Sequence, residues 1–214
     1  MMKERTMSIS ASATPQKIHE DSRPLVLGVL ALQGDYAAHA RAFASLGAAT
    51  RLVRKPEELE GLDGLVLPGG ESTTMLKFLE KKGFFEALRA FVAGRPCFAT
   101  CAGAILVARQ VLHPPQRSLE ALDATVERNA YGRQIDSTIL TLPTELAGGP
   151  LEMVFIRAPR LVRVGPSVEV LARRDGFPVL VRQGHLLAAT FHPEMTADTR
   201  VQQLFLEMVR SHKQ

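Results

Sequence analysis

Cysteine is scarce in this sequence of 214 residues, tryptophan is absent, and there are only 2 tyrosines. The 2 cysteines, Cys97 and Cys101, lie on one short segment. They are poorly placed there for a disulfide, and a secreted disulfide scaffold would carry more of them. Their spacing also lacks the further ligands that a zinc site requires. We therefore expect no metal site and a reduced, cytoplasmic setting.

Long hydrophobic runs and a strong net charge are missing as well. No apolar stretch approaches the length of a membrane span, and residues 1–23 lack the apolar segment of a signal peptide. The formal net charge of +4 is mild, and basic residues are not interleaved with aromatic ones. We expect neither a membrane nor a nucleic acid as partner. The polar residues 1–23 are predicted to be a disordered extension, which leaves residues 24–214 as one domain.

Apolar strands and helical segments alternate in the first half of the chain. The predicted strands are Leu25–Leu32, Ala49–Arg54, Leu65–Leu67 and the apolar segment that enters Cys101. The predicted helices are Tyr36–Leu46, Thr73–Lys82, Phe84–Ala93 and a short one at Ala104–Ala108. This alternation predicts an α/β fold with a mostly parallel sheet and helices on both faces.

After the loop at His113–Ser118 the pattern changes to shorter strands separated by turns. The predicted strands are Thr125–Arg128, Gln134–Leu142, Met153–Arg157, Val168–Arg173, Val179–Arg182 and Leu186–Phe191. They indicate a smaller antiparallel addition to the same domain, followed by a final amphipathic helix at Thr199–Arg210.

Cys101 follows an apolar strand at a turn of small residues and precedes an apolar helix. A strand-turn-helix corner of this kind exposes its middle side chain and aims backbone N–H groups at the same place, which is the geometry of a nucleophile elbow. The alternative is an inert cysteine buried among small core residues.

Candidate partners for the thiol stand at the ends of other strands, where ligands gather in parallel sheets. His192 and Glu194 follow the last predicted strand, and an extended segment would put both side chains on one side. A thiol, a base and a carboxylate that orients the base form a workable triad. His39 and His113 fit an ordinary structural role better, and His185 is assigned to a turn.

Gly69-Gly70-Glu71-Ser72 also follows a strand. A glycine here lets a backbone N–H approach a tetrahedral oxygen, as in an oxyanion hole. The alternative is a plain strand-to-helix turn with Ser72 as the helix cap.

Several strings of this sequence resemble the glutaminase subunits of pyridoxal 5'-phosphate synthase, the PdxT type of class I glutamine amidotransferases. These strings are GVLALQG (28–34), LPGGESTT (67–74), TCAG (100–103), VERNAYGRQ (126–134), FIRAP (155–159) and FHPE (191–194). TCAG and the His-Pro-Glu string alone indicate only a class I amidotransferase, whereas the others are typical of this subfamily. The resemblance spans residues 25–210.

The resemblance implies a flavodoxin-like class I amidotransferase fold for residues 24–214 and hydrolysis of L-glutamine to L-glutamate and ammonia. It implies that Cys101 is the nucleophile, His192 the general base and acid, and Glu194 the residue that orients His192. For substrate binding it implies Gly69, Gly70, Glu71, Arg128, Ile156 and Arg157, and for the oxyanion hole Gln33 and Ala102. No metal or organic cofactor is required, and the implied partner is a (β/α)8-barrel synthase subunit that receives the ammonia.

The sequence departs from this family at Ala99, where the family usually has glycine. A methyl group there would crowd the elbow, and a position with positive φ penalises alanine, but we expect it to be tolerated because alanine is the smallest substitute. Three other interpretations stay open: another amidotransferase glutaminase, of the imidazole-glycerol-phosphate or GMP synthetase type; a partner-binding module with a decayed elbow; and a thiol hydrolase of similar architecture that acts alone.

Overall fold

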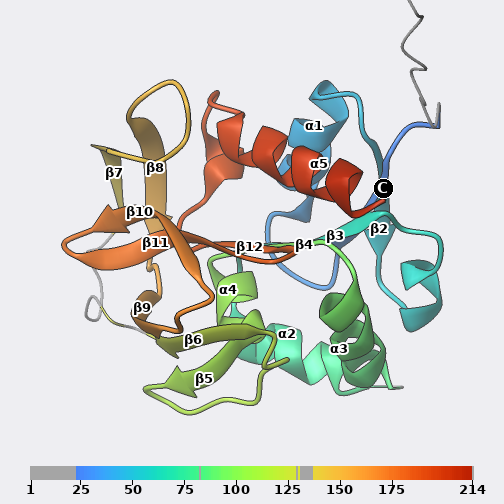
Figure 1. Ribbon diagram of the computed structural model, residues 1–214. Helices are drawn as coiled ribbons and strands as arrows, with labels where there is room; N and C mark the ends of the chain where they lie inside the picture. Colours follow the sequence, from blue (N-terminus) through green and yellow to red (C-terminus); the bar gives the residue numbers. More distant parts are fainter. Residues whose placement is uncertain (1–22, 82, 129, 131–136, 214) are drawn as a thin grey trace, which may run out of the picture.

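The computed structural model describes residues 23–81, 83–128, 130 and 137–213 and is built on one seven-stranded sheet (Figure 1). In spatial order the strands are β10 (Glu169–Arg174), β11 (Phe177–Gln183), β12 (Leu186–Ala189), β4 (Cys97–Thr100), β3 (Gly64–Leu67), β1 (Val26–Leu30) and β2 (Ala49–Val53). From β12 to β2 the neighbours run parallel, and β10 and β11 add an antiparallel edge. The predicted α/β fold with a mostly parallel sheet is confirmed.

Helices cover both faces of this sheet. On one side lie α1 (Tyr36–Ser45) and α5 (Arg200–His212), and on the other α2 (Ser72–Leu79), α3 (Phe84–Gly94) and the short α4 (Ala102–Val107) (Figure 1). Two 3-10 turns, η1 (Pro56–Leu59) and η2 (Pro193–Met195), complete the helical elements of the described residues. The central strands β3, β4 and β12 are buried along their whole length, as their continuous apolar sequences predict.

Each face has its own core. On the α1 and α5 side, the rings of Phe43, Phe98 and Phe205 pack against one another with centroids 5.6 to 6.4 Å apart. On the other side, apolar residues of α2, α3 and α4 pack against the opposite face of the same strands. The sheet is therefore fixed from both sides, and the loops at its carboxyl edge stand on a rigid base.

The second half of the chain differs in detail from the predicted antiparallel addition. Besides β10 and β11, it forms a three-stranded sheet of β5 (Ala108–Leu112), β6 (Leu122–Glu127) and β9 (Arg160–Val164), and a hairpin of β7 (Ser137–Leu142) and β8 (Leu151–Ile156). The sequence-based prediction missed β5 and β9, and β5 pairs parallel with β6. Of the strand predicted from residue 134, residues 134–136 lie outside the described residues.

Arg23 is the one residue of the predicted extension that the structure describes, and its guanidinium lies 2.8 Å from a carboxylate oxygen of Asp63. Residues 1–22 lie outside the described residues, so the assignment of residues 1–23 stays a prediction. Within the described part of the chain, no helix combines the length and apolar character needed to cross a membrane.

Candidate active site

The loops that follow β1, β3, β4 and β12 meet at one edge of the sheet. These four strands are consecutive neighbours, in the order β12-β4-β3-β1. Their carboxyl ends lead into Gln33, Gly69, Cys101 and His192, respectively. The topology thus brings together residues that are up to 159 positions apart in sequence (192 minus 33).

Cys101 occupies a strained corner between β4 and α4. Its φ is 48°, a value that non-glycine residues rarely adopt, and its N–H donates to the carbonyl oxygen of Ala189 at 2.8 Å. Gly103 allows the corner to stay tight, because a Cβ there would lie 2.1 Å from the carbonyl oxygen of Leu67. The predicted elbow is present.

Ala99 does not crowd this corner, contrary to the expectation from the sequence. It lies within β4, fully buried, and pairs with Leu67 on one side and Ala188 on the other. The positive φ falls on Cys101, two residues later, so the methyl group of Ala99 is a core side chain in extended backbone.

Gly69 lies between the elbow at Cys101 and the ring of His192. A Cβ at Gly69 would lie 2.4 Å from Cε1 of His192 and 3.2 Å from Cβ of Cys101. The imidazole and the thiol-bearing side chain therefore approach the same point of the backbone after β3, and only glycine leaves room for both.

His192 and Glu194 form the predicted pair, although the local structure differs from the prediction. Nδ1 of His192 lies 2.8 Å from Oε1 of Glu194. The segment is a 3-10 turn and not an extended strand, and the turn folds the carboxylate back onto the ring. Its backbone is held from two sides: the N–H of His192 donates to the carbonyl of Val154 at 2.8 Å, and the amide of Gln202 donates to the carbonyl of Pro193 at 3.0 Å.

The pKa values of this pair are shifted in opposite directions. Burial alone would lower the pKa of His192, but the interactions with Cys101 and Glu194 outweigh burial and raise it from 6.5 to about 10. Burial alone would raise the pKa of Glu194, but hydrogen bonds from His192 and His39 lower it from 4.5 to about 2. These directions favour a protonated His192 ring beside an ionised Glu194 carboxylate.

We call Cys101, His192, Glu194 and His39 the inner wall of the site, because all four side chains are buried. Gln33, Glu71 and Arg128 form the outer wall, which is open to solvent in part. Oε1 of Gln33 accepts a hydrogen bond from the N–H of Glu71 at 2.6 Å. The guanidinium of Arg128 lies 3.6 Å from the Glu71 carboxylate.

Glu71, not Ser72, caps helix α2. Its carboxylate accepts hydrogen bonds from the N–H groups of Thr73 and Thr74 at 3.0 and 2.7 Å. Burial would raise the pKa of Glu71, but hydrogen bonds from the side-chain and backbone groups of Thr74 and Thr73 lower it to about 2. Ser72 is instead buried, and its hydroxyl donates to Gln116 at 3.0 Å.

A cavity of about 280 Å³ opens between the two walls. Most of the predicted site residues line it, namely Gln33, Gly70, Glu71, Cys101, Arg128, Ile156, Arg157 and His192. Gly69, Ala102 and Glu194 stand directly behind this lining. The backbone of Arg157 has a positive φ of 45°, and the carbonyl oxygen of Ile156 lies 3.9 Å from the sulfur of Cys101. The prediction missed Ser72, Ile105 and Pro159, which complete the lining.

Two buried polar residues beneath the site were not predicted to take part in it. His39, assigned to an ordinary structural role, lies 3.3 Å from Oε2 of Glu194. Gln202 holds the turn that carries His192 and Glu194. A signal for His39 exists in the sequence: it stands one turn into the helix that starts at the carboxyl edge, on the helix face that is otherwise apolar.

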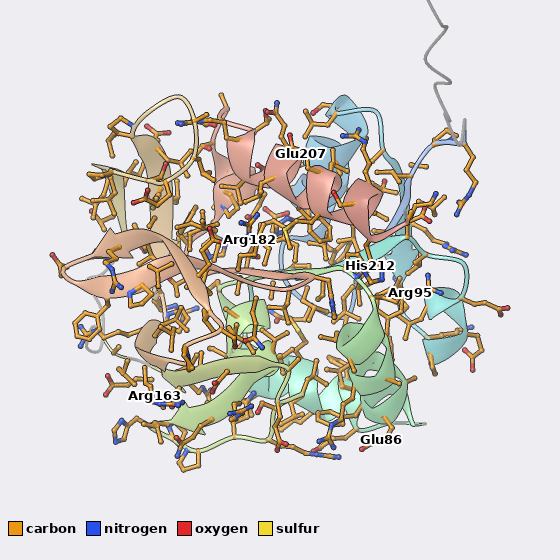
Figure 2. The ribbon with its side chains drawn as sticks, viewed as in Figure 1. Glu86, Arg95, Arg163, Arg182, Glu207 and His212 are labelled. Carbon is orange, nitrogen blue, oxygen red and sulfur yellow. The ribbon has the colours of Figure 1, made fainter. Side chains whose placement is uncertain are left out.

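A larger cavity of about 470 Å³ lies elsewhere, along α5. Its lining includes Arg182, Glu207 and His212, which Figure 2 labels on α5 and the neighbouring strand. Its lining includes Ser211, His185 and His212 but no thiol, whereas the smaller cavity holds Cys101 beside His192, so the smaller cavity is the candidate active site. Among the described residues, no group of three His, Cys, Asp or Glu side chains could hold a metal ion.

Comparisons with known proteins place the chain among glutamine amidotransferases. The sequence profile of the SNO glutamine amidotransferase family matches residues 29–211. The pyridoxal 5'-phosphate synthase subunit PdxT of Koribacter versatilis (strain Ellin345) is 62% identical over 185 residues, which cover 86% of this chain and 96% of the relative. The protein of the same name from Thermotoga neapolitana is 50% identical over 187 residues, covering 86% and 99%. A crystal structure titled as a glutamine amidotransferase superposes with a TM-score of 0.81 at 48% identity, covering 86% of this chain and 98% of that one.

Proposed function

The chain belongs to the SNO glutamine amidotransferase family, and from this premise we propose that it is the glutaminase subunit of a pyridoxal 5'-phosphate synthase. It hydrolyses L-glutamine to L-glutamate and ammonia through Cys101, His192 and Glu194. The observation that carries this proposal is the meeting of the elbow, the imidazole and the carboxylate beside Gly69 at one sheet edge.

The reaction begins with the thiolate of Cys101, which attacks the carboxamide carbon of glutamine and forms a C–S bond. Backbone N–H groups at the start of α4, Ala102 first, have no partner within the helix and face the developing oxyanion together with the Gly69-Gly70 loop. The C–N bond then breaks, and His192 gives its proton to the departing ammonia. A γ-glutamyl thioester on Cys101 remains.

The charge of Cys101 explains how His192 acts first as acid and then as base. The thiolate is one cause of the raised pKa of His192. When the sulfur becomes part of a thioester its charge is gone, so the pKa of His192 falls and the ring can take a proton from water. The hydroxide attacks the thioester, the C–S bond breaks, and glutamate leaves while the sulfur returns to thiolate.

The outer wall suits an amino acid substrate. Arg128 and Glu71 offer a positive and a negative group at the cavity mouth, which match the α-carboxylate and α-ammonium groups of glutamine. Gly70, Ile156 and Arg157 supply the backbone and side-chain surface around the carboxamide arm. No metal or organic cofactor enters any of these steps.

The partner in this proposal is a (β/α)8-barrel synthase subunit. The names of the relatives support a synthase assembly, since both are synthase subunits. Ammonia must stay away from bulk water to remain unprotonated, so we expect full glutaminase activity only when the synthase covers the site. A cytoplasmic location, as expected for a chain with free cysteines, is part of the same proposal.

Glutamate production from glutamine tests this function, measured with the chain alone and with a barrel synthase subunit added. We expect turnover to rise strongly with the synthase and to vanish in Cys101→Ala, which should still fold and bind the synthase. A matched control is Cys97→Ala, because Cys97 is fully buried away from the cavity and should be dispensable. Turnover retained in Cys101→Ala would remove the assignment. Equal rates with and without synthase would favour a hydrolase that acts alone.

A further inference from the structure

His39 lies deep in the interior, where burying a polar side chain is costly unless it forms hydrogen bonds. It is fully buried in α1, and its ring meets the ring of Phe98 edge to face at 6.1 Å. Its Nε2 lies between Oγ1 of Thr100 at 3.1 Å and Oε2 of Glu194 at 3.3 Å. Nδ1 is buried, and no group in the described part of the chain forms a hydrogen bond with it. Both polar contacts of the ring therefore pass through Nε2 and lead to residues next to Cys101 and His192.

The carboxylate of Glu194 is the group that would gain from a hydrogen bond with His39. Its side chain is fully buried, and one oxygen, Oε1, is engaged by Nδ1 of His192. A buried carboxylate with a second oxygen left without a donor would be costly and free to rotate. Within the described residues, Oε2 of Glu194 makes no hydrogen bond of full geometry, and Nε2 of His39 lies 3.3 Å from it, on the helix α1 that packs directly on the η2 turn.

We propose that His39 is a positioning residue that extends the triad to a fourth member, which donates Nε2–H to Oε2 of Glu194. We assign the proton to Nε2 because the buried Nδ1 has no acceptor and can remain a bare lone pair. The carboxylate is then held between two imidazoles, one from α1 and one from the turn after β12. This fixes the plane of the carboxylate and, through Oε1, the tautomer and orientation of His192.

The chain of contacts predicts an effect on turnover and not on substrate binding. His39 does not line the cavity, whereas Glu71 and Arg128 do. Loss of the donor leaves the affinity for glutamine unchanged and misplaces the base. This inference rests on the proposed function, and its test uses the chain assembled with a synthase subunit.

The test compares two substitutions of similar bulk. His39→Leu fills the space without a donor, and we expect kcat for glutamate production to fall by about 10- to 100-fold, the range usual for groups that orient a functional side chain, with KM unchanged. His39→Gln retains an N–H at the distal end, and we expect kcat within about threefold of wild type because the amide can reach the same oxygen. If His39→Gln keeps its activity while His39→Leu loses it, the role of His39 is a hydrogen bond and not packing.

His185→Leu is the matched control. His185 is a second, partly buried histidine whose Nε2 meets a backbone carbonyl, that of Val92, at 3.0 Å, away from the site. It should leave kcat unchanged. An unchanged kcat in His39→Leu would overturn the inference, as would equal losses in the leucine and glutamine variants. An inactive wild type would overturn the proposed function itself, and with it this inference.

Discussion

The inner and outer walls of the site each hold one carboxylate whose pKa is lowered to about 2, yet the causes differ. Glu194 is buried between His192, its neighbour at the η2 turn, and His39, which comes from the distant helix α1. Glu71 is half-exposed, and its hydrogen bonds come from the first turn of its own helix. Glu194 therefore depends on a tertiary contact with His39, whereas Glu71 is held by the first turn of its own helix.

This difference suggests a division of labour. The inner wall cannot move without disturbing the sheet edges that carry it, because both Cys101 and His192 are bonded through their backbones to neighbouring strands. The outer wall rests on a few side-chain hydrogen bonds at the surface, such as that of Gln33 with Glu71. Rigid groups suit bond breaking, and an adaptable rim suits substrate entry and the docking of a partner.

The largest expected effect breaks the inner wall. Glu194→Gln removes the charge that holds His192, and we expect kcat of the synthase-bound chain to fall by about 10³- to 10⁴-fold with little change in KM, as when the orienting acid of a triad becomes an amide. Glutamate production under saturating glutamine measures it. Glu71→Gln is the counterpart on the outer wall and should cost far less in kcat. Equal losses of kcat in Glu194→Gln and Glu71→Gln would contradict the different roles proposed for the inner and outer walls.

A smaller effect is expected on the outer wall. Arg128→Gln removes a guanidinium that is mostly buried beside the cavity, 2.9 Å from the hydroxyl of Thr73. Loss of a charged hydrogen bond to the substrate carboxylate should raise KM by about 10- to 100-fold while kcat changes little. Thr73→Val keeps the charge of Arg128 and removes only the hydroxyl that contacts it. The KM of this variant should therefore lie between those of the wild type and Arg128→Gln. If Arg128→Gln lowered kcat without changing KM, Arg128 would act in the chemical step, like the residues of the inner wall, and not in substrate binding.

The sequence predicts local features of this molecule better than distant contacts. The parallel sheet, its helices and the elbow at Cys101 follow from apolar runs and small-residue turns, which act over a few residues. Of the short strand β5, the prediction assigned Ala108 to the end of a helix and left the rest unassigned, because the apolar run of α4 ends at Ala108 and Arg109 and Gln110 follow it. The strand β9 was missed because it is only five residues long and its two arginines, three positions apart, interrupt the period-2 alternation expected of a strand.

The candidate site follows the same rule. Cys101, His192 and Glu194 could be proposed because each follows a strand end or a recognisable string. For His39 the sequence holds only a weak signal, a histidine on an otherwise apolar helix face, because its contact with Glu194 depends on where α1 crosses the turn after β12. The sequence does not say which residue of the elbow has positive φ; the structure gives it to Cys101, so the methyl group of Ala99 causes none of the crowding that was considered.

The smallest expected effect concerns stability at acidic pH. The folded-state pKa of Glu194, about 2, lies below its ordinary value of 4.5, so its contribution to stability is complete above about pH 4.5 and is lost as pH falls toward 2. Between about pH 5 and 3.5 we expect the wild type to lose on the order of 1 kcal/mol more unfolding free energy than Glu194→Gln. Denaturant unfolding at several pH values measures the difference in slope, which is independent of any constant penalty of the substitution. In Glu71→Gln the slope should change less, because solvent screens a half-exposed carboxylate. If the two variants flattened the pH dependence equally, burial between His39 and His192 would not be what distinguishes the inner wall.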